Sequence, residues 1–493
     1  MANSKAMGKT MFEDFQVKGF WWLPEKEEHV PGILFYKQDK IELELMGTLE
    51  SNERMFMEPT NQDIVWGRSD KGEEFTLFSA YSNGVSASFP GYATESYQVN
   101  SFLVGGHFHQ MNDIQFSYCS FAPTYLSTWF KRNVFLQETT YDQTDHFVRD
   151  RKITYTRPSA FKYYIPSINS HIEEGHLTKF SGVLHEEINW SSKSILYITP
   201  EHSQSMEWFK ENIFSLRELL ILFIGSTVYF EQIEFIGEEE IREGNSETYR
   251  PRYKYFQSQD KSKFKPEFKE KDILVKFSHI EENFNNILNS WFEKRNTLDT
   301  VRTLYFTDYY IEKDYLHKTF LNTIQILEIY HRHVYEGKLF EEDYYNQNVA
   351  QLINYAKSSL PEDFVQTIEK KLKHGNEYSL NKRLKEIINS LEKDSKLSLI
   401  GNSENRDRFI QQLVDTRNYL THYDKSEKKK LLETTLEKFY AIQRLKAIAT
   451  LIIVKELGVK ESLMLEVLEN NSRYKFVLNK AKEFLNKKPK VNQ

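Results

Sequence analysis

The fold of the C-terminal part is indicated by the stretch Val414-Asp415-Thr416-Arg417-Asn418-Tyr419-Leu420-Thr421-His422-Tyr423, which lies between two segments of helical periodicity. His422 is the only one of the fourteen histidines with an arginine, Arg417, five positions before it. A permanently charged guanidinium can hold a phosphate through two hydrogen bonds, and a histidine can move a proton near neutral pH. The stretch therefore predicts a helical junction suited to RNA cleavage without a metal ion.

Helical spacing of apolar residues continues on both sides of this stretch. Residues 407–420 predict one helix. Asp424 and Glu427 have the acid-x-x-Glu spacing of a helix start, and the next helix is predicted to end near Gly458. We expect this second helix to bury Leu432, Leu436, Phe439, Ile442, Leu445, Ile448, Leu451 and Ile452. Because the predicted link is short, the helices should pack antiparallel, with Arg417 and His422 pointing into one cleft.

The spacing also has a simpler interpretation. Arg417 could cap the last carbonyl groups of a helix, and His422 could be a loop residue. The Arg-Asn pair alone is not the signal, because Arg132-Asn133 and Arg295-Asn296 repeat it without a following histidine. Elsewhere, Glu328 and His331 could line the same cleft, although their pattern favours a packing or surface role.

The first two hundred residues are rich in strand patterns. Residues 41–45 alternate strictly between apolar and polar side chains, as in a half-buried strand. Similar patterns occur at residues 75–78, 101–104, 114–118 and 194–198, and residues 30–36 predict a turn that leads into a strand. A helix is predicted at residues 206–223, followed by a return to strand. Antiparallel sheets packed as a sandwich or barrel would bury these faces.

Length and periodicity indicate more than one domain, since 493 residues exceed the usual size of one. Residues 257–272 are lysine-rich without apolar periodicity, so we expect an exposed loop or an interdomain boundary. After residue 273 the pattern is helical. The chain is thus predicted to be an α+β multidomain protein, with a mainly-β domain at residues 1–275 and an all-α bundle at residues 276–493.

Composition limits the possible partners and cofactors. The net charge of −6 means that any RNA binding must be local. The single cysteine, Cys119, excludes an internal disulfide and a cysteine-based zinc cluster. His107-Phe108-His109 lacks further ligands for a metal site, so neither a metal nor another cofactor is predicted. Without a signal peptide or a membrane-spanning segment in the sequence, we expect a soluble, cytoplasmic protein with no membrane partner.

Four stretches resemble known families. Arg417-Asn418 with His422 between two helices resembles the HEPN superfamily, whose signature pairs an arginine with a histidine a few residues later. The stretch from Phe320 to Arg332 looks like the early helix of the HEPN domain in ApeA-type anti-phage proteins. The opening from Phe15 to Pro24, followed by Pro31-Gly32-Ile33-Leu34, looks like their N-terminal domain, and residues 216–236 are similar in style. The resemblance covers most of the chain.

The resemblance implies a HEPN ribonuclease that acts as a toxin in abortive infection. Such enzymes work as dimers without a metal ion and cut RNA internally, leaving a 2′,3′-cyclic phosphate and a 5′-hydroxyl. Arg417 would then stabilise the phosphate, His422 would transfer a proton or position the phosphate, and Asn418 would orient the site. A homodimer, host RNA such as tRNA, and an unknown phage-derived trigger of a sensory β-rich domain are the implied partners.

A second hypothesis has no catalysis. In it the HEPN-like bundle is a dimerisation module, and the β-rich domain binds a protein or a glycan. The acidic net charge is compatible with this alternative.

Overall fold

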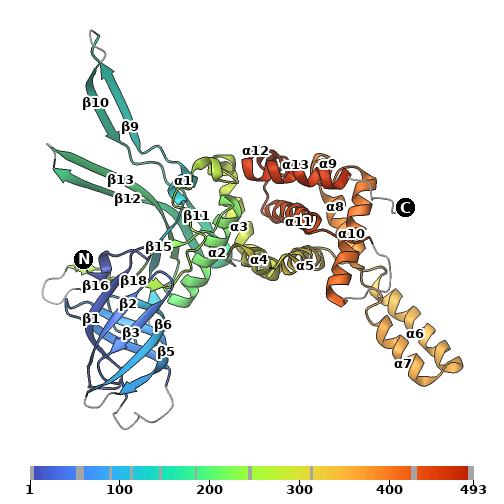
Figure 1. Ribbon diagram of the computed structural model, residues 1–493, viewed down its shortest axis with the longest axis horizontal. Coiled ribbons are helices and arrows are strands. Elements are labelled where there is room, and N and C mark those ends of the chain that lie inside the picture. The colour runs from blue at the N-terminus through green and yellow to red at the C-terminus, as the bar shows by residue number, and fades with distance from the viewer. Residues whose placement is uncertain are drawn as a thin grey trace. The chain divides into compact units, whose positions relative to one another are not determined.

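The computed structural model describes residues 5–50, 60–87, 91–110, 115–143, 147–183, 186–241, 247–310, 315–422 and 430–486. The chain forms two compact units, Met1–Asn285 and Asn286–Gln493. The first is mainly β and the second is helical, as the sequence predicts (Figure 1). The domain boundary placed between residues 275 and 276 stays a prediction.

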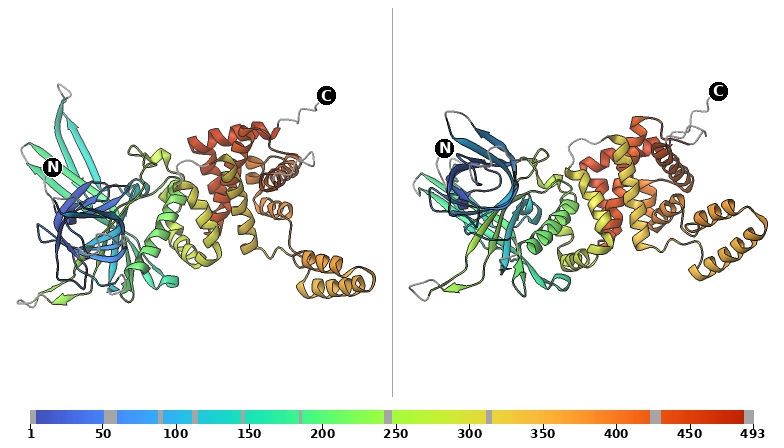
Figure 2. Two further views of the ribbon diagram at one scale, coloured as in Figure 1. Left: turned by 60° about the horizontal axis from the view of Figure 1, so that its bottom comes forward. Right: turned by 90° about the horizontal axis from the view of Figure 1, so that it is seen from below.

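Six strands of the N-terminal unit close into an antiparallel barrel in the order β1-β2-β3-β6-β5-β4, and β4 pairs with β1 again (Figure 2, right). Gly67 makes room for the buried ring of Trp21, because a Cβ atom at position 67 would lie only 2.2 Å from the ring. The strands are β1 (Phe15–Trp22), β2 (Val30–Tyr36), β3 (Ile41–Leu45), β4 (Gln62–Ser69), β5 (Glu74–Ala87) and β6 (Ala93–Val104).

An open sheet continues from the barrel, because the second half of β6 pairs with β18. Helix α2 (Met206–Ile224) packs on β8; Ser205 caps its start and Gly225, with φ of 76°, ends it. The remaining strands of this sheet, in order, are β18 (Arg252–Gln257), β15 (Phe230–Ile236), β8 (Tyr118–Pro123), β13 (Glu187–Pro200), β12 (Ser170–Val183) and β11 (Lys162–Ile165).

Two hairpins project from this unit (Figure 1). One consists of β9 (Phe135–Tyr141) and β10 (Val148–Tyr155), and the other is the outer part of β12 and β13. Short strands and a short α-helix of the unit include β7 (Gln115–Phe116), α1 (Leu126–Phe130), β14 (Gln204–Ser205), β16 (Glu240–Ile241) and β17 (Thr248–Tyr249).

The lysine-rich segment 257–272 is mostly irregular, as expected, but it is not an interdomain boundary. It packs on the β-rich unit, where the buried Gln259 side chain accepts from the Phe230 N–H at 2.9 Å and donates to the Phe230 carbonyl at 2.8 Å. The Lys265 N–H donates to the Tyr125 hydroxyl at 2.8 Å. The spacing of apolar residues could not predict this packing, because the contacts that hold residues 257–272 in place are polar.

The helical unit is arranged around α11, whose residues 447–454 are buried without a break. Helix α5 packs on α4 and α11, and α6 pairs with α7 around a small core of its own. None of the helices that the structure describes is long and apolar enough to cross a membrane. The helices are α3 (Phe284–Glu293), α4 (Arg295–Tyr310), α5 (Leu316–Val334), α6 (Glu342–Ser359), α7 (Glu362–Leu372), α8 (Leu380–Ser390), α9 (Lys393–Leu399), α10 (Ser403–His422), α11 (Thr435–Glu456), α12 (Glu461–Asn470) and α13 (Ser472–Asn486).

Candidate active site

Helix α10 carries all three residues predicted to form the site. It is longer at both ends than the predicted helix over residues 407–420. Near its start, the Asn402 side chain accepts a hydrogen bond from the Asn405 N–H at 2.9 Å, which satisfies a backbone donor that the helix leaves unpaired. Its buried face includes Phe409, Leu413 and Leu420.

Arg417 and Asn418 form a local pair on α10. Both side chains are half-buried, and the Arg417 Nη1 donates to the Asn418 Oδ1 at 3.3 Å. Among the residues that the structure describes, no carboxylate forms an ion pair with Arg417. The amide of Asn418 restricts the orientation of the guanidinium.

His422 is the last residue of α10 and is exposed. The sequence placed it outside the helix, in a short junction, but the helix continues through it. At 3.6 residues per turn, a separation of five positions turns the side chain by about 140°. Arg417 and His422 of one chain therefore start from different faces of the same helix, and the expectation that both side chains point into one cleft stays a prediction.

Two buried polar residues before Arg417 hold the returning chain. The Asp415 Oδ2 accepts from the Lys430 N–H at 3.1 Å, and the Thr416 Oγ1 accepts from the Leu432 N–H at 2.9 Å. Gln411 donates to the other Asp415 oxygen at 2.8 Å. These contacts clamp residues 430–432 against α10. Sequence reasoning missed them, although two polar residues at buried positions of a helix were a visible signal.

The second helix of the junction begins later than predicted. The predicted start at residues 424–427 lies outside the described residues, and α11 begins at Thr435 behind a capping box. In this box Thr434 accepts from the Glu437 N–H at 3.1 Å, and Glu437 accepts from the Thr434 N–H at 2.9 Å. The link is long, and α10 packs chiefly on α8 and α5, so the predicted close antiparallel pairing with the next helix is wrong. Three predicted core residues lie differently: Leu432 is buried but precedes the helix, and Leu436 and Phe439 are exposed.

A buried polar network joins α5 to α8, the two helices on which α10 packs. The His331 Nδ1 accepts from the Arg383 Nη1 at 3.1 Å, so the proton of the neutral ring is on Nε2, which donates to Glu386 at 2.8 Å. Burial lowers the pKa of His331. Glu328 pairs with Arg332 at 3.3 Å. These contacts agree with the packing role that the sequence favoured for both residues.

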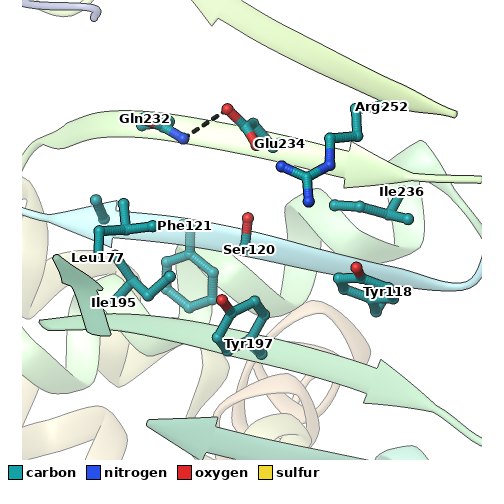
Figure 3. Close-up of a pocket in the computed structure, with 11 residues that line it drawn as sticks. Tyr118, Ser120, Phe121, Leu177, Ile195, Tyr197, Gln232, Glu234, Ile236 and Arg252 are labelled. Atoms are coloured by element: carbon teal, nitrogen blue, oxygen red, sulfur yellow. Dashed lines mark hydrogen bonds between the residues drawn. The ribbon is translucent and has the colours of Figure 1, made fainter. Parts of the chain in front are cut away.

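The open sheet of the β-rich unit carries a shallow depression of about 130 Å³. Polar groups of Ser120, Glu234 and Arg252 lie across it, with Tyr118 and Tyr197 along one side (Figure 3). Gln232 donates to Glu234 at 2.6 Å. The depression is small and mixed in polarity, and no charged cluster in it singles out a ligand class.

Two family models match separate parts of the chain. The model for the ApeA N-terminal domain 1 matches residues 16–291, and the model for the Apea-like HEPN domain matches residues 321–463. No curated protein and no solved structure matches the chain. The two matches confirm the resemblance drawn from the sequence. The second match includes all of α10, and with it Arg417, Asn418 and His422.

Proposed function

The chain belongs to the ApeA-type family of HEPN proteins, and from this premise we propose that it is a metal-independent endoribonuclease of anti-phage abortive infection. The observation that carries the proposal is the placement of Arg417, Asn418 and His422 on one helix within the HEPN match. Arg417 lacks a carboxylate partner among the described residues, and His422 is exposed at the end of α10.

The proposed reaction is an internal transesterification. The 2′-oxygen of a ribose forms a bond to the adjacent phosphorus, and the bond from phosphorus to the 5′-oxygen breaks. His422 transfers a proton or positions the phosphate, so that the 2′-hydroxyl proton is lost and the leaving 5′-oxygen gains one. Arg417 binds two non-bridging oxygens and stabilises the charge that develops on them. Asn418 orients the guanidinium.

A homodimer is part of the proposal. The chain has one Arg-Asn-x-x-x-His motif, and its two charged groups begin on different faces of α10. A twofold axis beside this helix would bring the Arg417 of one copy towards the His422 of the other. Two such sites would then lie on opposite sides of the axis.

The proposed substrate is host RNA, and tRNA is the first class to test. The β-rich domain is the proposed sensor of a phage-derived trigger. In this scheme the trigger releases the nuclease, and RNA loss stops growth before the phage completes its cycle. The non-catalytic alternative instead assigns the HEPN-like bundle to dimerisation alone.

The test is RNA cleavage by purified protein in EDTA. Wild type, His422→Ala and the control His333→Ala, which changes an exposed histidine of α5, are incubated with total cellular RNA and the product ends are mapped. We expect cyclic-phosphate ends from wild type and the control only. Cleavage that survives in His422→Ala would place the chemistry elsewhere, and inactivity of all three would fit either a nuclease that awaits its trigger or the binding protein.

A further inference from the structure

The β9–β10 hairpin carries most of its apolar side chains on one face, where Gln137, Thr139 and Arg151 also lie, and we call this its apolar face. Paired residues share a face and neighbours alternate, so the register puts Ile153 and Tyr141 on the face of Phe135 and Tyr155. Ile153 and Tyr141 are 54 % and 60 % exposed. The other face consists mainly of charged residues and threonines: Leu136, Glu138, Thr140, Asp150, Lys152 and Thr154. We call this hairpin the first arm.

The outer part of β12 and β13, residues 176–183 and 187–194, forms a second arm of the same kind. Its register places Phe180 opposite Trp190, with Ile188 on the same face. Phe180 and Ile188 are 58 % and 57 % exposed. Val183 belongs to the opposite face, beside lysine, serine and asparagine side chains.

The apolar faces of the two arms meet at Trp190. Its ring centroid lies 5.4 Å from that of Phe135 and 5.3 Å from that of Tyr155, and the Tyr155 hydroxyl is 3.0 Å from the Thr178 Oγ1. Phe180 packs on the same tryptophan at 5.7 Å. Farther from this contact, exposed apolar side chains continue along both faces, interrupted on the first arm by the Thr139–Arg151 pair.

The charge of the arms does not suit a nucleic acid. Residues 135–155 carry three Arg or Lys against four Asp or Glu, a net charge of −1, and residues 176–194 carry two against two. Binding to a phosphate backbone requires a basic surface. The partner of these faces should therefore be a protein surface that is itself apolar.

We propose that the apolar faces of the two arms bind a second copy of this chain. At roughly 200 Å² for a large side chain, the exposed fractions of Tyr141, Val148, Ile153, Phe180, Ile188 and Trp190 amount to about 600 Å² per copy, or about 1,200 Å² for two, which is the lower end for stable interfaces. An exposed apolar surface promotes non-specific association of a single chain. The partner that covers this surface must therefore be present in the cell whenever the protein is present. A second copy meets this condition, and a partner met only occasionally does not.

The first test measures assembly of the full-length protein by analytical ultracentrifugation. The double variant Ile153→Lys, Phe180→Lys changes the apolar faces. The control Leu136→Lys, Val183→Lys changes residues of similar exposure, 55 % and 49 %, on the opposite faces. We expect the dissociation constant to rise at least ten-fold in the first variant and to stay at the wild-type value in the control. Equal constants for all three proteins would overturn the proposal.

A cross-linking test separates the arms from any contact between HEPN domains. The native Cys119 is buried, so a cysteine introduced at the surface is the reactive one. Ile153→Cys and Phe180→Cys proteins, alone and mixed, are treated with a short bis-maleimide beside Leu136→Cys. Covalent dimers should form from the apolar-face cysteines and not from the control. Equal yields would contradict the proposal, and since no step depends on cleavage, its failure is distinct from failure of the ribonuclease proposal.

Discussion

The guanidinium of Arg417 can be tested by a change that keeps its charge. Arg417→Lys replaces a planar fork with a single ammonium group, which cannot bind two phosphate oxygens in parallel or keep the same geometry against Asn418. We expect roughly a 100-fold loss of RNA cleavage with an unchanged fold. Single-turnover cleavage and circular dichroism measure the two quantities.

The matched control for this change is Arg406→Lys on the same helix. Arg406 donates to the Asn389 side chain at 2.9 Å, and its position is three turns before Arg417. This variant should cleave RNA at the wild-type rate. Wild-type activity in Arg417→Lys would remove the bidentate role, and equal losses in both variants would indicate a general effect of charge placement on α10.

Thr416 tests the clamp on residues 430–432. Thr416→Val keeps the shape but leaves the buried Leu432 N–H without its acceptor, which costs about 1–3 kcal/mol of local stability. Amide hydrogen exchange at Leu432 should become faster, and Thr416→Ser should restore the slow rate. Unchanged exchange in Thr416→Val would mean that the hydrogen bond does not hold this segment.

At the residue scale, the sequence predicted the motif because its chemistry is local. The Arg417–His422 spacing and the polar Asn418 can be read directly from the chain. The roles of Asp415 and Thr416 depend on backbone groups fifteen and sixteen residues later, and no local pattern names those partners.

At the scale of elements, periodicity identified strands and helices better than their ends. Residues 41–45 form β3 as predicted, and the helix predicted from residue 206 is α2. Residues 30–36, expected to be a turn that leads into a strand, belong to strand β2 throughout. The predicted start of α11 was wrong because the sequence contains two patterns typical of a helix start. Only the second, at Thr434 and Glu437, precedes the observed helix.

The contact between α5 and α8 gives a prediction about pH. Burial lowers the pKa of His331 below its unfolded value of 6.5, so the folded state resists protonation that the unfolded state accepts. The contribution to the free energy of unfolding is present above pH 6.5 and decreases as pH falls towards the lowered pKa. Urea denaturation of wild type should therefore show lower stability at pH 5 than at pH 7.

His331→Gln is the comparison for this pH effect. Glutamine cannot take up a proton in this range, yet its amide can accept from Arg383 and donate to Glu386. The variant should lose less stability than wild type between pH 7 and pH 5. If the free energy of unfolding changed equally with pH in both proteins, the pKa of His331 would not differ between the folded and unfolded states.

At the scale of the whole molecule, the two units have separate cores, and Gly67→Ala should affect one of them. The added Cβ would lie 2.2 Å from the Trp21 ring in the barrel, and overpacking of this kind costs about 1–3 kcal/mol. Hydrogen exchange followed by mass spectrometry should show lost protection in barrel peptides and unchanged protection in α11. Gly8→Ala, with nothing within 4 Å of its Cβ, is the control. Loss of protection in both units would contradict independent cores.

Molecular architecture was only partly predictable from the chain. The order of a β-rich part followed by a helical part follows from a change of period, and a barrel was one of two expected solutions. Closure through β1 and β4, and the meeting of two arms at Trp190, depend on register between distant strands. Single-sequence patterns do not encode such pairings directly.

The most direct test of the central claim is the mapping of RNA ends in phage-infected cells that produce wild type or His422→Ala at equal levels. The ribonuclease account predicts discrete new 5′-hydroxyl and cyclic-phosphate ends, together with growth arrest, for wild type only. The same ends in both strains, or growth arrest by wild type without new ends, would contradict it.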